Sequence, residues 1–496
     1  MLPIFRFPKV AIIGSGFSGL SAACYLSSFG YQVDVFEKNN SFGGRARQFN
    51  TDCGFRFDMG PSWYWMPDVV ESFFADFGFS TADFYDLKPL NPQFEIVFDG
   101  ESIDVPADMQ QLRALFESIE CGAGKQFDRF MEDAQEKYEI AMSDFIYTPS
   151  LSWMEFLTPR MLAASTRLNL LTSFRTYVRK YFKDPRLLAL MEFPVIFLGA
   201  SPRDIPAMYS LMSYGGYGLG TWYPQGGFKS VVDAMVYIAE QKGVNFHLDT
   251  TVENIQINDS RAISLNTSQG GIETFDYLVG SSDYKHTESL LPQDYRNYSE
   301  QYWSKKTLAP SCLIYYLGFD VKIPNLKHHT LFFEHDMDAH LSTVYDTKEW
   351  PESPLFYACC PSKTDAEVAP LGSENLFLLL PLAVGLEDPE NIREQYLEMM
   401  LSRLEKHTGA IGLKQHLVYK RSYCVSDFQK DYNAFNGNAY GLANTLKQTA
   451  VLKPSIRNKK VKNIFYTGQL TVPGPGVPPS IISGKIVARE IQKQNL

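Results

Sequence analysis

The segment Lys9-Val10-Ala11-Ile12-Ile13-Gly14-Ser15-Gly16-Phe17-Ser18-Gly19 decides the fold of this chain. Its first five residues predict a buried strand, and the glycines that follow form a GxGxxG turn at the start of a helix that ends near Gly30. A second apolar run, Gln32-Val33-Asp34-Val35-Phe36, predicts another strand and is followed by Glu37. The order of strand, glycine turn, helix, strand and acid is typical of a unit that binds a dinucleotide.

The glycines and the acid each have a physical role in such a unit. Gly14 permits the tight turn, Gly16 lets backbone N–H groups approach a pyrophosphate, and Gly19 lets the helix pack closely on the strand. The helix N-terminus offers further unpaired amides to the phosphates. Glu37 stands where a carboxylate binds ribose hydroxyls, which favours FAD or NAD over NADP.

A second glycine loop, at 41–46, extends the predicted phosphate site. Gly43 and Gly44 expose backbone amides, and Arg45 supplies a planar cation for phosphate. Together they resemble the GG-R motif of flavoproteins built like glutathione reductase or monoamine oxidase, in which this loop closes on the FAD pyrophosphate. We therefore expect FAD as the cofactor. The sequence shows no second GxGxxG after a strand, so we expect the electrons to come from a substrate rather than from NAD(P)H on a second domain.

Composition narrows the function classes. The 496 residues carry 46 Lys and Arg against 56 Asp and Glu, a net charge of −10, which argues against nucleic acid as a partner. The 6 Trp, 28 Tyr and 36 Phe could line a large apolar cavity or fill a large core. The longest apolar run, 376–386, is much shorter than the ~20 residues of a spanning helix, which leaves peripheral membrane contact open.

We expect an α/β fold in which a discontinuous, Rossmann-like FAD-binding domain, of the glutathione reductase and amine oxidase type, is interrupted by a mixed α+β substrate domain. The alternation of predicted strands and helices places the FAD-binding segments at 1–90, 216–292 and 456–496. The substrate segments are 91–215, which is largely helical and is expected to face a membrane, and 293–455.

A local reversal of charge lies between 156 and 183, where six basic residues occur without an acid. Apolar residues recur there at helical spacing, at Leu171, Phe174, Val178 and Tyr181. A basic amphipathic helix can lie on an anionic membrane, and a surface helix paired with acids of its own protein explains the pattern equally well. The basic residues are Arg160, Arg167, Arg175, Arg179, Lys180 and Lys183.

A cluster rich in histidine and acids lies between 328 and 340. Its spacing fits neither HExxH nor a facial triad, and the seven cysteines form no CxxC pair, so we interpret it as an exposed polar loop and expect no metal. Its members are His328, His329, Glu334, His335, Asp336, Asp338 and His340.

Taken together, the motifs resemble the phytoene desaturase family of bacterial carotenoid desaturases over nearly the whole chain. Beyond the N-terminal motifs, the matching stretches are 57–62, 222–227, 247–255, 282–287 and 468–483. The last one resembles the closing flavin loop of the family and is the most specific. It departs from the family at Pro478-Pro479, where Pro-Gly is usual, and Pro479 removes an amide that could face the flavin.

The resemblance implies a set of site residues. Three consecutive aromatic residues, Trp63, Tyr64 and Trp65, cannot all point into one core from one strand. They form either a packed loop or a wall that faces the flavin or the substrate, and we expect them to line the substrate cavity. No catalytic side chain is expected, because the flavin is the redox centre. The expected FAD contacts are Gly14, Gly16, Gly19, Glu37, Lys38, Gly44, Arg45, Gly60, Pro61, Ser62, Val252, Gly468, Val477 and Pro478.

The resemblance also implies an FAD-dependent oxidoreductase that introduces C=C bonds into an acyclic carotenoid, from phytoene towards lycopene, by hydride transfer to flavin N5. One alternative is a desaturase of a hydroxylated acyclic or monocyclic carotenoid, of the hydroxycarotenoid 3,4-desaturase type, and another is a carotenoid isomerase of the same superfamily. The expected partners are a long apolar carotenoid, the inner face of the cytoplasmic membrane as a peripheral surface, and oxygen or quinone as electron acceptor. The intact glycines and Arg45 argue against a flavin-free escort for prenyl lipids.

Overall fold

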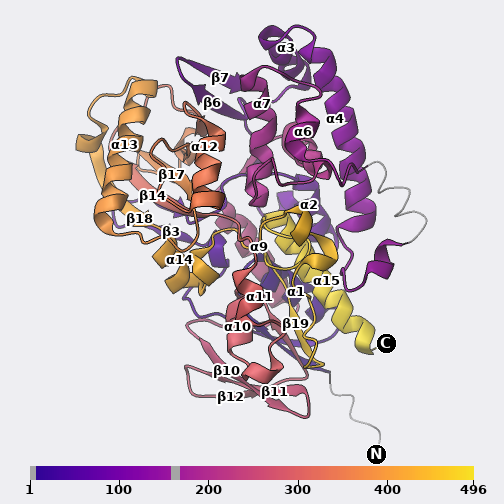
Figure 1. Cartoon of the computed structure of the whole chain (residues 1–496). Helices are drawn as coiled ribbons and strands as arrows, with labels where there is room; N and C mark the ends of the chain where they lie inside the picture. The colour runs from indigo at the N-terminus through magenta and orange to yellow at the C-terminus, as the bar shows by residue number, and fades with distance from the viewer. Residues whose placement is uncertain (1–6, 158–167, 496) are drawn as a thin grey trace, which may run out of the picture.

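The computed structural model describes residues 7–157 and 168–495. A five-stranded parallel sheet in the order β19-β13-β1-β2-β9 lies in the lower half of Figure 1. Segments that are hundreds of residues apart therefore share one sheet. Its strands are β1 (Lys9–Ile13), β2 (Gln32–Phe36), β9 (Asn245–His247), β13 (Tyr277–Gly280) and β19 (Ile464–Tyr466).

Three helices pack together on this sheet: α1 (Phe17–Ser28), α9 (Phe228–Gln241) and α15 (Val477–Asn495). Helix α1 contacts both α9 and α15 and is buried along most of its length. A small antiparallel sheet follows β9, with strands β10 (Val252–Asn258), β11 (Arg261–Thr267) and β12 (Ile272–Thr274). This unit confirms the expected discontinuous Rossmann-like domain, whereas the exact domain boundaries stay a prediction.

A second, seven-stranded sheet forms the core of the substrate domain, in the order β18-β14-β17-β16-β15-β6-β7. Its side chains alternate between two clusters, because successive residues of a strand face opposite sides. Leu313, Tyr315 and Leu317 pack under α13 (Glu390–Thr408), whereas Cys312 and Ile314 face the rest of the molecule. The strands are β6 (Phe94–Phe98), β7 (Glu101–Val105), β14 (Ser311–Phe319), β15 (His329–Phe332), β16 (Phe356–Cys359), β17 (Glu374–Leu382) and β18 (Leu417–Tyr423).

The remaining elements connect the two sheets or form the helical region at the upper right of Figure 1. The longer helices are α2 (Pro67–Ala75), α3 (Met109–Ile119), α4 (Ala123–Ile140), α7 (Pro185–Glu192) and α14 (Val425–Tyr432). The shorter elements are α6 (Phe174–Val178), α8 (Leu211–Ser213), α10 (Tyr284–Ser289), α11 (Glu300–Ser304), α12 (Met337–Ser342), β3 (Gln48–Asn50), β4 (Arg56–Asp58), β5 (Leu87–Pro89) and β8 (Trp222–Pro224).

The basic segment differs from the helix that its spacing predicts. Among the described residues 168–183, α6 is the one α-helix and is five residues long, and Leu171 precedes it with 94% of its surface exposed. Arg175 pairs with Asp338, and Arg179 lies 3.6 Å from the buried carboxylate of Glu192. Two of the basic residues therefore face acids of their own protein, while Arg160 and Arg167 lie outside the described residues. In the described part of the chain, no helix is long and apolar enough to cross a membrane.

Candidate flavin and substrate site

One large cavity connects the two sheets. It begins at the carboxyl ends of β1, β2 and β13, which is where open parallel sheets bind nucleotides. It then continues along the inner face of the seven-stranded sheet. We call these parts the nucleotide half and the apolar half. The apolar half is lined by Trp63, Trp65, Met66, Phe193, Ile196, Leu198, Met212, Leu331, Phe333, Met337, Leu341, Leu355, Phe356 and Leu379.

In the glycine turn of the nucleotide half, different glycines serve ligand binding and helix packing. Gly14 has a φ of +102°, which the turn between β1 and α1 requires and which favours glycine. A Cβ on Gly16 would meet no atom within 4 Å, because this residue faces the open cavity. A Cβ on Gly19 would lie 2.1 Å from the Gly14 carbonyl oxygen. Gly16 therefore leaves room for a ligand, and Gly19 leaves room for the strand.

Glu37 is fixed at the end of β2 and lines the cavity although only 5% of it is exposed. One carboxylate oxygen accepts from the Ser15 N–H at 2.9 Å and from the Ser15 hydroxyl at 2.8 Å. The other accepts from the N–H and the side-chain amide of Asn39, both at 2.9 Å. The acid is thus held against the glycine turn, in the position that a ribose-binding carboxylate requires.

Arg45 is partly buried and carries an unused hydrogen-bond donor at its buried Nε. Its Nη2 donates to the Asn438 carbonyl at 3.1 Å, and the guanidinium lies over the Tyr432 ring. Its Nε has no hydrogen-bond partner among the described residues. Burial lowers the pKa of this guanidinium, and the carboxylate of Asp283 opposes the shift. A cation with a buried, unpaired N–H fits an anionic phosphate better than it fits an empty loop.

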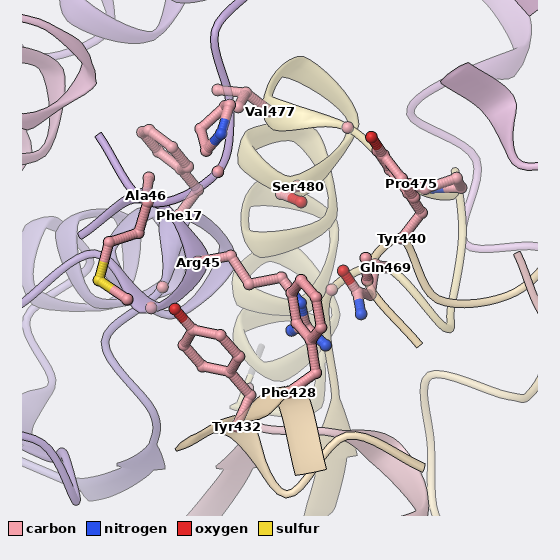
Figure 2. Close-up of a pocket in the computed structure, with 18 of the residues that line it drawn as sticks. Phe17, Arg45, Ala46, Phe428, Tyr432, Tyr440, Gln469, Pro475, Val477 and Ser480 are labelled. Carbon is pink, nitrogen blue, oxygen red and sulfur yellow. The ribbon is translucent and has the colours of Figure 1, made fainter. Parts of the chain in front are cut away.

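The closing loop brings the far end of the chain to the same place. In Figure 2, Arg45, Tyr432 and Gln469 gather on one side of the cavity, and Val477 lies across from them at the start of α15. With the Gln469 amide oxygen turned towards Arg45, that oxygen accepts from Nη2 at 2.9 Å. These contacts join residues more than 420 positions apart in the sequence.

The two prolines reduce the donors at the N-terminus of α15. Pro478 and Pro479 occupy its first turn and carry no N–H, and the Ser480 N–H already donates to the Gly476 carbonyl at 3.0 Å. Among the first helical residues, Val477 is therefore the one whose amide can still face a ligand. Pro478 is also present in the family pattern, so the departure at Pro479 removes one further donor at this end.

The structure brings most of the expected site residues into this cavity wall. Gly19 and Tyr64 are the exceptions, since Gly19 packs beneath the turn and the hydroxyl of Tyr64 pairs with that of Tyr85 at 2.9 Å. Trp63 and Trp65 line the apolar half, whereas the buried Tyr64 does not. The other expected residues on the wall are Gly14, Gly16, Glu37, Lys38, Gly44, Arg45, Gly60, Pro61, Ser62, Val252, Gly468, Val477 and Pro478.

A turn at 60–62 joins the two halves. A Cβ on Gly60 would lie 2.6 Å from the Arg45 carbonyl oxygen, so glycine is required for this close approach. The Tyr316 hydroxyl donates to the Met59 carbonyl at 2.7 Å and holds the turn in place. Gly60 touches the Arg45 loop, and Ser62 follows Gly60 by two positions. Ser62 therefore lies at the start of the apolar half, next to the nucleotide half.

The histidine cluster is an exposed loop only in part: His335, Asp336 and Asp338 are exposed, as expected. For the three buried histidines the interpretation is wrong, since His328 lies just before β15, His329 on β15 and His340 on α12. The first two are buried because this segment enters the sheet as a strand. Burial lowers the pKa of His328 to about 3 and that of His340 to about 4, so both are neutral at pH 7. One ligand atom each of His328, His329 and Cys359 lies within 4.8 Å of the others. Burial raises the pKa of the Cys359 thiol to about 12, and the absence of a metal stays a prediction.

Much of the apolar half could not be predicted from sequence. Phe193, Met212 and Phe333 come from three separate segments and carry no motif that distinguishes them from core residues. Tyr440 and Tyr357 also reach the wall from distant segments. The only available signal was the high aromatic content, which a core would explain equally well.

Comparisons with known proteins agree with this geometry. A family model for flavin containing amine oxidoreductases matches residues 17–492. A carotenoid 3,4-desaturase of Haloarcula japonica is 42% identical over 487 residues, which are 97% of each chain. A 4,4'-diapophytoene desaturase of Staphylococcus haemolyticus is 29% identical over 492 residues, again 97% of each chain.

Solved structures show the same fold. An oxidoreductase from Methanosarcina mazei superposes with a TM-score of 0.61 at 17% identity, covering 98% of this chain and 100% of that one. Reduced UDP-galactopyranose mutase gives 0.61 at 15% identity, covering 99% and 95%.

The fold and the site define an FAD-dependent oxidoreductase, and the chain belongs to the flavin-containing amine oxidoreductase family. Within that family it is one of the carotenoid desaturases, as its similarity to the named desaturases over almost its whole length shows. The residues fit the cofactor, since Gly16 is open, Arg45 has an unpaired N–H and Glu37 is positioned for a ribose.

Proposed function

We propose that this enzyme desaturates the 3,4 bond near the end of an acyclic carotenoid that carries a hydroxyl group. The observation that carries the proposal is the 42% identity, over 97% of both chains, to a carotenoid 3,4-desaturase. The diapophytoene desaturases reach 29% over a similar length. This difference favours the hydroxycarotenoid alternative over the conversion of phytoene towards lycopene.

The chain's own residues bind and orient the polyene. FAD, when bound, supplies the hydride acceptor. The aromatic and aliphatic wall of the apolar half excludes water and matches a long hydrocarbon. Trp63 is held in that wall by stacking on His329, with ring centroids 4.2 Å apart and planes 11° from parallel. The substrate is therefore positioned by packing rather than by charge.

No strong base is needed for the proton that leaves with the hydride, because conjugation spreads the developing positive charge along the polyene. Of the titratable groups in the apolar half, His340 is engaged at both ring nitrogens. Its Nδ1 accepts from the Leu355 N–H at 2.7 Å, and its Nε2 lies 2.9 Å from the Pro381 carbonyl oxygen. In this tautomer His340 has no free lone pair for a proton in the cavity.

We further propose that the enzyme meets its substrate as a peripheral protein on the inner face of the cytoplasmic membrane, with oxygen or quinone as electron acceptor. Support comes from exposed apolar side chains at 153–157 and 171 rather than from the basic helix. Trp153 is 60% exposed, Met154 78%, Leu157 62% and Leu171 94%. Exposed large apolar side chains of this kind are typical of a surface that inserts into lipid headgroups.

The function is tested with FAD-loaded protein and liposomes that contain either phytoene or a hydroxylated acyclic carotenoid. The absorbance bands of the extracted products count the double bonds that are added. A red shift for the hydroxylated substrate, corresponding to one added bond at its end, is the expected result. A shift for phytoene alone would show a phytoene desaturase, and geometric isomers without added bonds would show an isomerase.

A further inference from the structure

The apolar half contains one connected group of polar side chains at its border with the nucleotide half. Among the described residues, the hydroxyl and imidazole side chains on the apolar wall are Ser62, His340, Tyr357 and Tyr440. His340 is saturated by backbone groups, as described above. Ser62 and Tyr357 instead hydrogen-bond to each other, with 3.0 Å between their oxygens.

The hydroxyl pair continues into a buried histidine. The Tyr357 oxygen lies 2.6 Å from His329 Nδ1. His329 has no exposed surface, and its ring is covered by the stacked Trp63. Burial, together with the neighbouring His328, lowers the pKa of His329 well below 6.5, so the ring is neutral. His329 is thus a fixed, uncharged partner behind Tyr357.

The positions of the hydrogen atoms decide which group at the end of this hydrogen-bonded series has a donor to spare. His329 Nε2 is buried without a partner among the described residues. An unpaired acceptor is tolerated better than an unpaired N–H, so the proton belongs on Nδ1, which then donates to the Tyr357 oxygen. Tyr357, whose hydroxyl also contacts the Cys359 thiol, donates in turn to Ser62 Oγ. For Ser62 this is the one hydrogen-bond partner among the described residues. The hydroxyl hydrogen of Ser62 is left over at the cavity wall.

We propose that Ser62 and Tyr357, with His329 behind them, form an anchor for the hydroxyl oxygen at the end of the carotenoid. The proposal rests on the proposed function and names the residues that recognise the substrate. A hydroxyl oxygen can accept the spare hydrogen of Ser62, whereas a hydrocarbon end would leave that donor unpaired against apolar surface.

The position of the anchor matches the bond that reacts. Ser62 follows Gly60, whose Cα packs against the Arg45 carbonyl in the nucleotide half. The anchor therefore lies at the flavin end of the apolar half, not deep inside it. In carotenoid numbering, carbons 1 and 2 precede the 3,4 bond, so an oxygen on these end carbons is close to the reacting carbons. An anchor at the far end would instead suit desaturation in the middle of the chain.

The test compares a hydroxylated acyclic carotenoid with the hydrocarbon of the same chain length, each presented in liposomes to the FAD-loaded enzyme. The measured quantity is the ratio of kcat/KM for the two substrates. We expect Ser62→Ala and Tyr357→Phe to lower kcat/KM for the hydroxylated substrate by about 3- to 10-fold, as the loss of one hydrogen bond predicts. For Tyr357→Phe the value for the hydrocarbon should stay within a factor of two, and most of the change should appear in KM. Ser62 is also an expected FAD contact, so Ser62→Ala is judged by the ratio of the two substrates, with FAD affinity measured beside it.

Two further variants make the result specific. Tyr85→Phe removes a buried hydroxyl pair outside the cavity and should leave the substrate ratio unchanged. Tyr440→Phe removes the other tyrosine hydroxyl of the apolar wall. A change of ratio that follows Tyr440 instead of Ser62 and Tyr357 would overturn the anchor.

The remaining outcomes separate the two proposals. If the native enzyme converts both carotenoids and the variants slow both equally, the anchor is wrong while the desaturase function stands. If the native enzyme converts neither carotenoid, the proposed function is wrong, and the anchor proposal, which depends on it, is wrong as well. Loss confined to the hydroxylated substrate supports both.

Discussion

The substitutions Gly16→Ala and Gly19→Ala add the same methyl group three residues apart, and the structure predicts opposite effects. At Gly16 the new Cβ would meet no protein atom within 4 Å, and the backbone, with φ −71°, accepts alanine. At Gly19 the new Cβ would lie 2.1 Å from the Gly14 oxygen and 2.9 Å from the Ser281 hydroxyl. The first change occupies space that a ligand uses, and the second occupies space that the fold uses.

The magnitudes follow from these contacts. Gly16→Ala should displace the pyrophosphate from backbone amides, and the loss of one hydrogen bond to a charged group costs about 1.5–3 kcal/mol. FAD should then bind about 10- to 150-fold more weakly. Gly19→Ala should force the start of α1 away from β1, and such overpacking costs about 1–3 kcal/mol of folding free energy or more.

Both effects can be measured on flavin-free protein. Titration with FAD, followed by the quenching of flavin fluorescence, gives the affinity, and thermal unfolding of the apoprotein gives the stability. The expected result is a weak-binding, normally stable Gly16→Ala and an unstable Gly19→Ala. Native affinity in Gly16→Ala, or an apoprotein Tm as low as that of Gly19→Ala, would refute the assignment of Gly16 to the ligand cradle.

Three further predictions follow from the site. Arg45→Lys removes the unpaired Nε–H and the planar fork, so FAD affinity should fall about 10-fold by the same titration, and an unchanged affinity would remove Arg45 from the phosphate site. The pKa of His340 is about 4 in the folded protein and ~6.5 in the unfolded chain, so on acidification the unfolded chain binds the proton first. The free energy of unfolding therefore falls by about 1.4 kcal/mol for each pH unit between pH 6.5 and pH 4. His340→Gln keeps an acceptor and a donor for the two backbone groups and should reduce the slope of unfolding free energy against pH over that window, to which the buried His328 and His329 also contribute. An equal slope in urea unfolding of the variant would contradict this origin. Replacing Trp153 and Met154 by serine should lower sedimentation with anionic liposomes, and binding equal to that of the native protein would exclude this surface as the membrane contact.

Local motifs were predictable because neighbouring residues determine them. The strand before Gly14, the helix after it and the position of Glu37 depend on short-range sterics and hydrogen bonds. The strands expected at 9–13 and 32–36 form over those residues, and the helix between them ends at Ser28, close to the expected end near Gly30. In the region 171–183 the same reasoning failed, because the apolar spacing there reflects tertiary packing of a short helix rather than a long amphipathic one.

Residue type alone could not assign the side chains that line the cavity. Trp63 and Trp65 face the cavity while Tyr64 between them pairs with Tyr85, because alternate residues of an extended segment point to opposite sides. His328 and His329 have the composition of a polar loop, yet strand pairing with β16 buries them. In both cases the environment comes from segments distant in the sequence.

The sequence by itself determined the dinucleotide unit, the choice of FAD and the family of the enzyme. These depend on contiguous glycines, an acid and a cation whose spacing is fixed by backbone geometry. Only the tertiary structure decided which aromatic residues form the apolar half, that Arg45 keeps a free donor, and that Ser62, Tyr357 and His329 are connected. Such groupings arise when sheets and helices bring residues hundreds of positions apart into contact, and no local pattern encodes which residues will meet.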